Sequence, residues 1–214
     1  QEYHKSVVAI GNFDGIHNGH KALIRKVVQL AKQSSRMAGL ISFTPHPRVF
    51  FSGKENFSQI NDEVTRQDIL RRQDLDILFK VKFNKDLSLM PPDIFFYDVL
   101  KNGINVSHIV VGSDFKFGHK RLGNIEILGE LSKENNIGFD VIEKQANNSL
   151  KTYSSSAIRE YLLEGNISEA NKMLGHYWYT MGVVIAGANK GNQIGFPTIN
   201  IKLDGSIKFA HGIY

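Results

Sequence analysis

Two histidines, His17 and His20, stand three residues apart in the glycine-rich stretch 11–20. An apolar run at 7–10 precedes this stretch and predicts a buried strand, and residues 21–32 follow it with apolar side chains at helical spacing. Because a helix start offers unpaired N–H groups and a partial positive charge, this strand, turn and helix favour a phosphate site. On one side of the first helical turn, both histidines could donate hydrogen bonds to oxygens that gain charge in a transition state.

A histidine near a helix start is more often a cap or a surface residue, and His-x-Gly-His alone is a weak motif. The ten-residue stretch 11–20 is a stronger signal, because the strand and the helix that it requires lie on either side of it. The chain contains no Gly-Lys-Ser or Gly-Lys-Thr sequence of the Walker type, which excludes a P-loop.

The loop 43–47 follows a second predicted strand and contains two prolines around a histidine. Pro45 and Pro47 restrict the backbone and would hold His46 at the edge of the sheet. An ordinary rigid turn would have the same sequence, so the loop alone does not distinguish the two interpretations.

The loop 112–118 combines a carboxylate, a cation and two aromatic rings between glycines. Gly112 opens it and Asp114 supplies the carboxylate. The rings of Phe115 and Phe117 could stack on a flat ring system such as adenine or isoalloxazine. The alternative is a surface loop with buried aromatic anchors.

Three serines at 154–156 and an arginine, Arg159, form the last such segment. A helix start rich in hydroxyls, including Ser155 and Ser156, could hold a triphosphate together with the fork of donors on the arginine. The alternative is an ordinary N-cap followed by a solvated arginine.

Strands and helices alternate through residues 6–142, which predicts a parallel sheet with right-handed crossovers, a doubly wound α/β fold. The loops at 11–20 and 112–118 follow strands at their carboxyl ends, where ligands bind in such sheets. The predicted strands are 7–10, 38–43, 77–83, 108–111 and 138–142, and the predicted helices are 20–34, 62–73, 92–102, 125–135 and 155–164.

The pattern changes toward the end of the chain. A short helix predicted at 168–174 is followed by a long strand predicted at 177–185 and by further β-rich sequence. We therefore predict an α/β domain at 1–176 and the beginning of a β-rich domain at 177–214. Because segments of fewer than ~40 residues rarely fold alone, we expect the chain to be cut within its second domain.

Composition limits the remaining classes of protein. Of the 214 residues, 42% are apolar and the mean hydropathy is −0.22, which indicates a packed, soluble chain; no apolar run approaches the ~20 residues of a membrane span. The sequence has no cysteine, which excludes disulfides and thiolate chemistry, and we expect a cytoplasmic protein with no membrane partner. A net charge of +5 without a dense basic block argues against nucleic acid as a partner and suits anionic nucleotides. The sequence leaves the oligomeric state open.

In this order, the four segments resemble the motifs of the HxGH nucleotidylyltransferase superfamily. With Asn-Phe-Asp-Gly leading into the histidines, the chain is similar to the adenylyltransferase half of the bifunctional bacterial riboflavin kinase/FAD synthetases. The other shared motifs are Pro-His-Pro, Gly-x-Asp-Phe-x-Phe-Gly and Ser-Ser-Thr-x-x-Arg, in which Ser156 replaces the usual threonine. The resemblance covers most of residues 7–160 and implies a Rossmann-like domain.

The resemblance implies adenylyl transfer, in which a phosphate oxygen of FMN attacks the α-phosphorus of ATP and pyrophosphate leaves. It also implies Mg²⁺ bound mainly through substrate phosphates. The implied catalytic residues are His17, His20 and Arg159. The implied ATP-binding residues are Gly11, Asn12, Phe13, Asp14, Gly19, Gly112, Asp114, Ser155 and Ser156, and the implied flavin-binding residues are Pro45, His46, Pro47, Phe115 and Phe117.

Residues 182–187 and 195–200 resemble the opening motifs of a flavokinase β-barrel, and the resemblance implies that Thr198 and Asn200 contact Mg²⁺ and ATP there. Asn192 stands where that family often has arginine, which removes a charge near the nucleotide. The catalytic glutamate of the family would lie beyond the last residue of this sequence. We therefore expect riboflavin to be phosphorylated to FMN only by a longer chain.

Two other functions stay open. A related nucleotidylyltransferase could act on nicotinamide mononucleotide, phosphopantetheine or a phosphorylated alcohol, although the Pro-His-Pro loop and the flavokinase-like end favour a flavin. A catalytically inactive module could bind flavin and nucleotide, although both histidines and the arginine are present.

Overall fold

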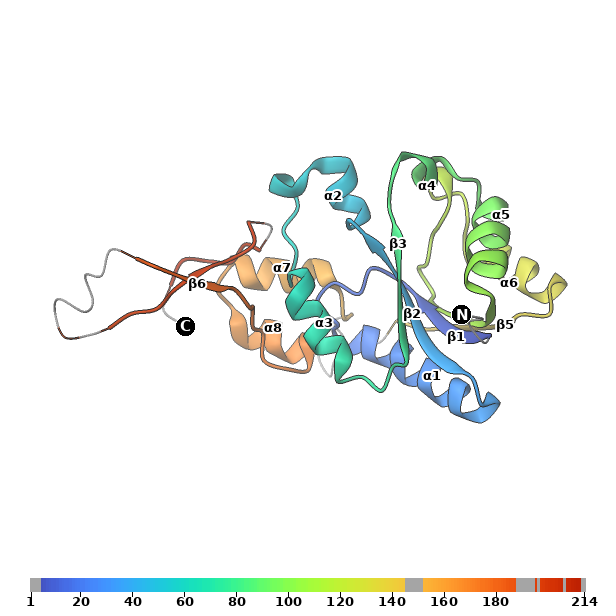
Figure 1. Cartoon of the computed structure of the whole chain (residues 1–214), viewed down its shortest axis with the longest axis horizontal. Helices are drawn as coiled ribbons and strands as arrows, with labels where there is room; N and C mark the ends of the chain where they lie inside the picture. The colour runs from blue at the N-terminus through green and yellow to red at the C-terminus, as the bar shows by residue number, and fades with distance from the viewer. Residues whose placement is uncertain (1–4, 145–151, 188–194, 196, 206, 213–214) are drawn as a thin grey trace.

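A five-stranded parallel sheet forms the centre of the protein, with strand order β3-β2-β1-β4-β5 (Figure 1). The computed structural model describes residues 5–144, 152–187, 195, 197–205 and 207–212. The strands are β1 (Ser6–Ile10), β2 (Met37–Thr44), β3 (Ile77–Lys82), β4 (Val106–Gly112) and β5 (Gly138–Ile142). The predicted parallel sheet is confirmed, and each strand ends within two residues of its predicted bounds.

Helices cover both faces of this sheet because alternate residues of its strands are apolar on both sides. In β1, Val7 and Ala9 belong to one core cluster, while Val8 and Ile10 belong to another on the opposite face. The first cluster includes α1 (Asn18–Ser34) and α3 (Glu63–Arg71), and the second includes η2 (Phe95–Ile104) and α6 (Ile125–Glu134). The prediction of a doubly wound sheet is confirmed to this extent.

Several short helices follow strands and were not predicted. They are α2 (Pro47–Ser52), η1 (Lys54–Asn56), α4 (Lys85–Leu89) and η3 (His119–Arg121). Such short helices show too few turns for apolar periodicity to mark them. The predicted helix 92–102 is α5 (Pro92–Ile94) continued by η2, whose hydrogen bonds are of the π type and which runs past Gly103 to Ile104.

Two helices, α7 (Ser155–Leu163) and α8 (Ile167–Leu174), lie side by side on the side of the sheet away from α6, between the sheet and the carboxy-terminal strands (Figure 1). Their buried side chains form a third core cluster with Ile60, and Trp178 packs against it. Ala210 of the carboxy-terminal part donates its N–H to the carbonyl of Leu162, at 2.9 Å. This third cluster therefore joins α7 and α8 to the segment around Ile60 and to the carboxy-terminal part of the chain.

The predicted strand 177–185 is wrong over its first six residues. Only β6 (Val183–Ile185) is a strand, and it pairs antiparallel with β7 (Asn200–Lys202) in a two-stranded ribbon. Residues 177–181 instead form a strap whose polar groups bind the first domain: Tyr179 Oη, for example, lies 2.6 Å from an Asp68 oxygen. The predicted beginning of a β-barrel stays a prediction, and its residues Asn192 and Phe196 lie outside the described residues.

Within the described part of the chain, none of the helices has both the length and the apolar character needed to cross a membrane.

Candidate active site

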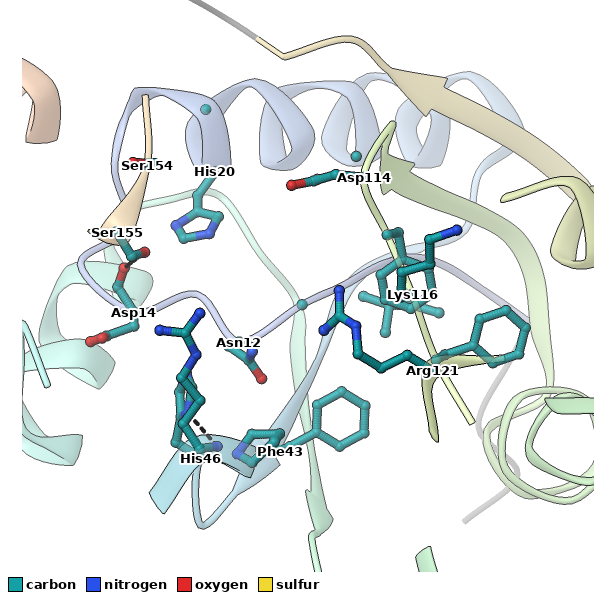
Figure 2. A pocket seen from close by; sticks show the side chains of 18 of the residues that line it. Asn12, Asp14, His20, Phe43, His46, Asp114, Lys116, Arg121, Ser154 and Ser155 are labelled. Atoms are coloured by element: carbon teal, nitrogen blue, oxygen red, sulfur yellow. Dashed lines mark hydrogen bonds between the residues drawn. The ribbon is translucent and has the colours of Figure 1, made fainter. Parts of the chain in front are cut away.

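A cavity of about 640 Å³ opens where the carboxyl ends of the five strands meet. The strand order reverses between β1 and β4, which is where ligands bind in sheets of this topology. Figure 2 shows that the walls of the cavity come from segments far apart in the sequence. Predicted site residues that line the cavity are Gly11, Asn12, Asp14, His17, Gly19, His20, His46, Pro47, Gly112, Asp114, Phe115, Phe117, Ser155, Ser156 and Arg159.

The turn after β1 is held in an unusual backbone conformation. Phe13 and Ile16 have φ angles of +50° and +45°, a region that side chains rarely adopt, and both are fully buried. Gly15 has a φ angle of +85°, and an added Cβ would lie 2.8 Å from the side chain of Ile60. Phe13 therefore anchors the turn in the core, outside the cavity lining, while its neighbours Asn12 and Asp14 line the cavity.

The two histidines stack on each other at the start of α1. Their ring centroids are 3.7 Å apart and the ring planes are inclined by 17°. His17 is the N-cap of the helix, since its Nδ1 accepts the backbone N–H of His20 at 3.3 Å. A neutral imidazole has one N–H, so this acceptor role places the proton of His17 on Nε2. The helix consequently begins two residues earlier than predicted.

Both histidines are neutral in the free protein. Burial lowers the pKa of His17 to about 4 and the pKa of His20 well below its usual range, and the charge of Arg159 lowers both further. The Nδ1 atom of His20 is buried and has no hydrogen-bond partner among the described residues. A ligand with phosphate oxygens could satisfy this unmet hydrogen-bonding capacity.

Asp14 and Arg159 form a buried ion pair across the cavity floor, with Oδ2 and an Nη atom 2.6 Å apart. Asp14 is 3% exposed, and its Oδ1 accepts the backbone N–H groups of Ile60 at 3.0 Å and Asn61 at 3.4 Å. Burial raises the pKa of Asp14, and the Arg159 guanidinium and the two amide donors oppose that rise. Removing any one of these partners would leave a buried group unpaired.

Arg159 is fixed from three sides, so its guanidinium has one position. Besides Asp14, its Nε donates to the carbonyl of Ser58 at 2.7 Å, and its guanidinium lies 4.4 Å from the centre of the Phe57 ring. Sequence reasoning missed this loop, residues 57–61, because its contribution comes largely from backbone groups that any residue would supply. We call residues 57–61 the bridging loop.

The start of α7 is tied to the turn after β1. Ser154 is the N-cap and accepts the backbone N–H of Ala157 at 3.2 Å. The hydroxyl of Ser155 donates to the carbonyl of Asp14 at 2.8 Å, whereas Ser156 is exposed at the cavity. Of the two serines predicted to bind phosphate, Ser155 thus has a structural partner, whereas Ser156 is exposed and lines the cavity.

His46 caps α2 as His17 caps α1, because its Nδ1 accepts the backbone N–H of Arg48 at 3.1 Å. Its ring stacks on Phe57 with centroids 4.6 Å apart. Burial, with the charge of Arg159, lowers the pKa of His46 to about 3. His46 therefore shapes the wall, while Pro45, which follows a cis peptide bond, lies outside the lining.

The loop 112–118 adds an aromatic and a charged wall. The rings of Phe115 and Phe117 stack with centroids 5.6 Å apart, but Phe117 is buried in the second core, so Phe115 is the more accessible of the two. Asp114 is exposed and pairs with Lys144 at 3.1 Å.

Cations line the cavity in larger number than the motifs indicate. Figure 2 shows the guanidinium of Arg121 reaching toward Asn12 across the cavity. The signal in the sequence that could have found these residues is the basic run 116–121. The cationic lining residues besides Arg159 are Arg48, Lys116, Lys120, Arg121 and Lys144. A cavity of this charge favours a polyanionic ligand.

The described residues contain no group of three or more His, Cys, Asp or Glu side chains placed to hold a metal ion. A divalent cation in this cavity would therefore depend on ligand phosphates and water for most of its coordination. Thr198 and Asn200 are exposed and lie on or beside the β6–β7 ribbon, outside the cavity lining.

The sheet topology and the paired helix starts define a nucleotide-binding α/β domain, and comparison with known proteins makes the assignment specific. Residues 1–157 match the FAD synthetase family and residues 174–214 match the riboflavin kinase family. The chain belongs to the FAD synthetase family, and relatives that it matches are bifunctional riboflavin kinase/FMN adenylyltransferases.

Among these relatives, the protein from Buchnera aphidicola subspecies Schizaphis graminum is 35% identical over 98% of this chain and 67% of its own length. The protein from Listeria monocytogenes is 33% identical over 92% of this chain and 62% of its own length. The chain thus spans about two thirds of the length of such relatives.

Solved structures are similar as well. One from Streptococcus pneumoniae, described as a macrolide-efflux protein, has a TM-score of 0.85 and 27% identity. The match covers 97% of this chain and 68% of the Streptococcus pneumoniae chain. Pantoate-β-alanine ligase from Francisella tularensis has a TM-score of 0.50 and 16% identity, with 80% of this chain and 70% of its own covered, which shows the fold alone.

Proposed function

We propose that this chain transfers the adenylyl group of ATP to FMN, giving FAD and pyrophosphate. The observation that carries the proposal is the meeting of two helix starts at one cationic cavity, one with the stacked neutral pair His17 and His20 and one with Arg159. The family assignment supports FMN as the acceptor.

In the proposed reaction, a phosphate oxygen of FMN forms a bond to the α-phosphorus of ATP while the bond from that phosphorus to the bridging oxygen breaks, and pyrophosphate carries the electron pair away. The Nε2–H of His17 and an N–H of His20 would donate to phosphate oxygens as their charge grows. Because burial keeps both rings neutral, they would act as hydrogen-bond donors and not as general acids.

The start of α7 would hold the triphosphate. Ser156 and the α7 backbone N–H groups would donate to outer phosphate oxygens, and Arg159 would supply a fixed positive charge. Asn12, Gly11 and Gly19 would let the turn after β1 approach the nucleotide, with Gly112 and Asp114 on the opposite wall. His46, Pro47 and Phe115 would border the flavin, with Pro45 and Phe117 supporting them from behind.

Mg²⁺, when bound between phosphates, would neutralise part of their charge and help the leaving group depart. The scarcity of clustered carboxylates among the described residues supports a metal held mainly by substrate.

A second activity, phosphorylation of riboflavin to FMN, is proposed for a protein that carries the complete kinase domain. The match of residues 174–214 to the riboflavin kinase family supports it. In such a protein Thr198 and Asn200 would contact Mg²⁺ and ATP. We keep 176 as the proposed boundary between the two domains.

The test is to incubate the purified chain with ATP, Mg²⁺ and FMN and to separate the products by chromatography. FAD and pyrophosphate in equal amounts are the expected result, and a parallel reaction with riboflavin should give neither. Absence of FAD while FMN and ATP both bind would favour the inactive module. If FMN is not consumed but another phosphorylated acceptor is adenylylated, the chain is a related transferase and the proposal is overturned.

A further inference from the structure

The bridging loop, residues 57–61, has one side at the candidate site and its other side against the carboxy-terminal part of the chain. Toward the site it supplies the ring under Arg159 and the N–H groups bound by Asp14. On its other side, the indole Nε1–H of Trp178 donates to the carbonyl of Ile60 at 2.9 Å. Ile60 therefore binds Asp14 through its N–H and Trp178 through its carbonyl.

Further contacts join the same two segments. The side-chain amide of Asn61 donates to the carbonyl of Tyr179 at 3.4 Å, and Gln59 forms a parallel β-bridge with Ile207. Ile60 is wholly buried, so its carbonyl would have no access to water if the indole donor were removed.

The strap that carries Trp178 is itself anchored. The Trp178 backbone N–H donates to an Asn171 side-chain oxygen at 2.6 Å, and its ring lies 5.1 Å from the ring of Phe209. Farther along, Thr180 donates its hydroxyl to Asp62 at 3.0 Å and the N–H of Met181 donates to the Thr65 hydroxyl oxygen at 3.0 Å. The indole is thus presented to the loop from a fixed support.

We propose that Trp178 is a positioning residue for adenylyl transfer: it fixes the Ile60 peptide, which orients Asp14, which in turn holds Arg159. The proposal rests on the proposed function of the site. Trp178 lies in the stretch 174–214 that matches the riboflavin kinase family, outside the FAD synthetase match. One activity would therefore depend on a side chain from the sequence region of the other.

The first test compares two conservative variants of the strap. Trp178→Phe keeps an aromatic ring and removes the donor to Ile60, and it should lower kcat for FAD formation about tenfold with an unchanged KM for FMN. Tyr179→Phe is the matched control, since it removes the hydrogen bond to Asp68 and leaves the bridging loop untouched. Its kcat should stay within about twofold of wild type. Equal losses in both variants would overturn the proposal.

A double-mutant cycle then tests the route. If Trp178 acts through Asp14, the change Trp178→Phe should cost less than about twofold in an Asp14→Asn background. Additive losses would overturn the proposal. If Trp178→Phe does not fold, Phe209→Leu loosens the packing of the indole and keeps its N–H. That variant should show about a threefold loss of kcat that disappears in the same background, and a loss that persists there would count against the proposal.

The outcome for the wild-type chain separates the two proposals. If the wild-type chain forms no FAD, the proposed function fails. The wild-type chain, Trp178→Phe, Asp14→Asn and the double variant are then compared by calorimetry for their affinity for ATP with Mg²⁺. Coupling between positions 14 and 178 in that affinity supports the positioning role, and independence overturns it.

Discussion

The two helices that begin at the cavity hold their functional side chains in opposite ways. At the start of α1, His17 and His20 stack on each other, are neutral, and leave a buried ring nitrogen without a partner among the described residues. In α7, Arg159 is charged and bound by a carboxylate, a carbonyl and an aromatic ring. One helix start is left with hydrogen-bonding capacity for a ligand, and the other presents a charge already in position.

The two helix starts are electrostatically linked. The charge of Arg159 lowers the pKa of both His17 and His20, which adds to the effect of burial. A fixed cation therefore keeps the neighbouring rings as neutral donors, and a bound polyanion would act against both effects.

The strongest test of the comparison is loss of the fixed charge. Arg159→Ala should lower kcat/KM for FAD formation about 1000-fold, as for other arginines on transferring phosphates. It should also destabilise the fold by about 3–5 kcal/mol, because Asp14 would be left buried and unpaired. Steady-state kinetics and urea unfolding measure the two effects.

Arg159→Lys is its matched control, since it keeps the charge and loses the fork of donors. Activity between that of wild type and of Arg159→Ala is expected. A level in Arg159→Ala above about a tenth of wild type would show that this charge is dispensable.

The next largest effect concerns the neutral donors. His20→Ala should lower kcat on the order of 100-fold, as for loss of one donor to a developing negative charge, with little effect on KM for FMN. Rapid-quench measurement of FAD formation separates the chemical step from release. Near-normal turnover would remove His20 from the reaction and leave α1 with a structural role only.

The neutrality of the histidines should appear in the pH dependence of stability. An unfolded histidine has a pKa near 6.5, whereas that of His17 is about 4 and that of His46 is about 3. Below about pH 6.5 the unfolded chain binds more protons than the folded chain. The contribution of these histidines to the unfolding free energy is therefore complete above that pH and is lost as the pH is lowered. Between about pH 7 and about pH 5, each histidine should cost about 2 kcal/mol of unfolding free energy.

Urea unfolding at the two pH values gives this loss directly. His46→Asn keeps an acceptor for the Arg48 N–H and removes a titrating group, so the loss should shrink by the share of one histidine. Unchanged pH dependence in this variant would mean that the pKa of His46 is the same in the folded and the unfolded chain.

The smallest effect distinguishes the serines of α7. Ser156→Ala should raise KM for ATP about fivefold at unchanged stability, because its hydroxyl faces the cavity. Ser155→Ala should instead lower the unfolding free energy by about 1 kcal/mol, because it loses the bond to the Asp14 carbonyl. The reverse pattern would exchange their roles.

Much of the scaffold could be predicted from the sequence, because local signals fix it. β5 has its predicted bounds, and the segments around His20, His46, Asp114 and Ser156 do meet at one cavity. The carboxyl ends of parallel strands share one edge of a sheet, so the position of each loop followed from the strand before it.

What could not be predicted depends on partners distant in the sequence. The bridging loop acts through the Ser58 carbonyl and the Ile60 N–H, which leave no trace in side-chain pattern. The strap has aromatic and β-branched residues that are typical of a strand, yet Trp178 and Thr180 carry polar atoms that find acceptors in the first domain. Tertiary hydrogen bonds decided the outcome over local propensity.

Trp178 is the single tryptophan of the chain, and its indole N–H is bound to the loop that holds the candidate site. Light absorbed near the red edge of protein absorption would excite this residue alone. Its emission spectrum therefore depends on the surroundings of one hydrogen bond, and a titration with ATP in the absence of flavin would report optically, without any label, whether the bridging loop shifts as the nucleotide enters.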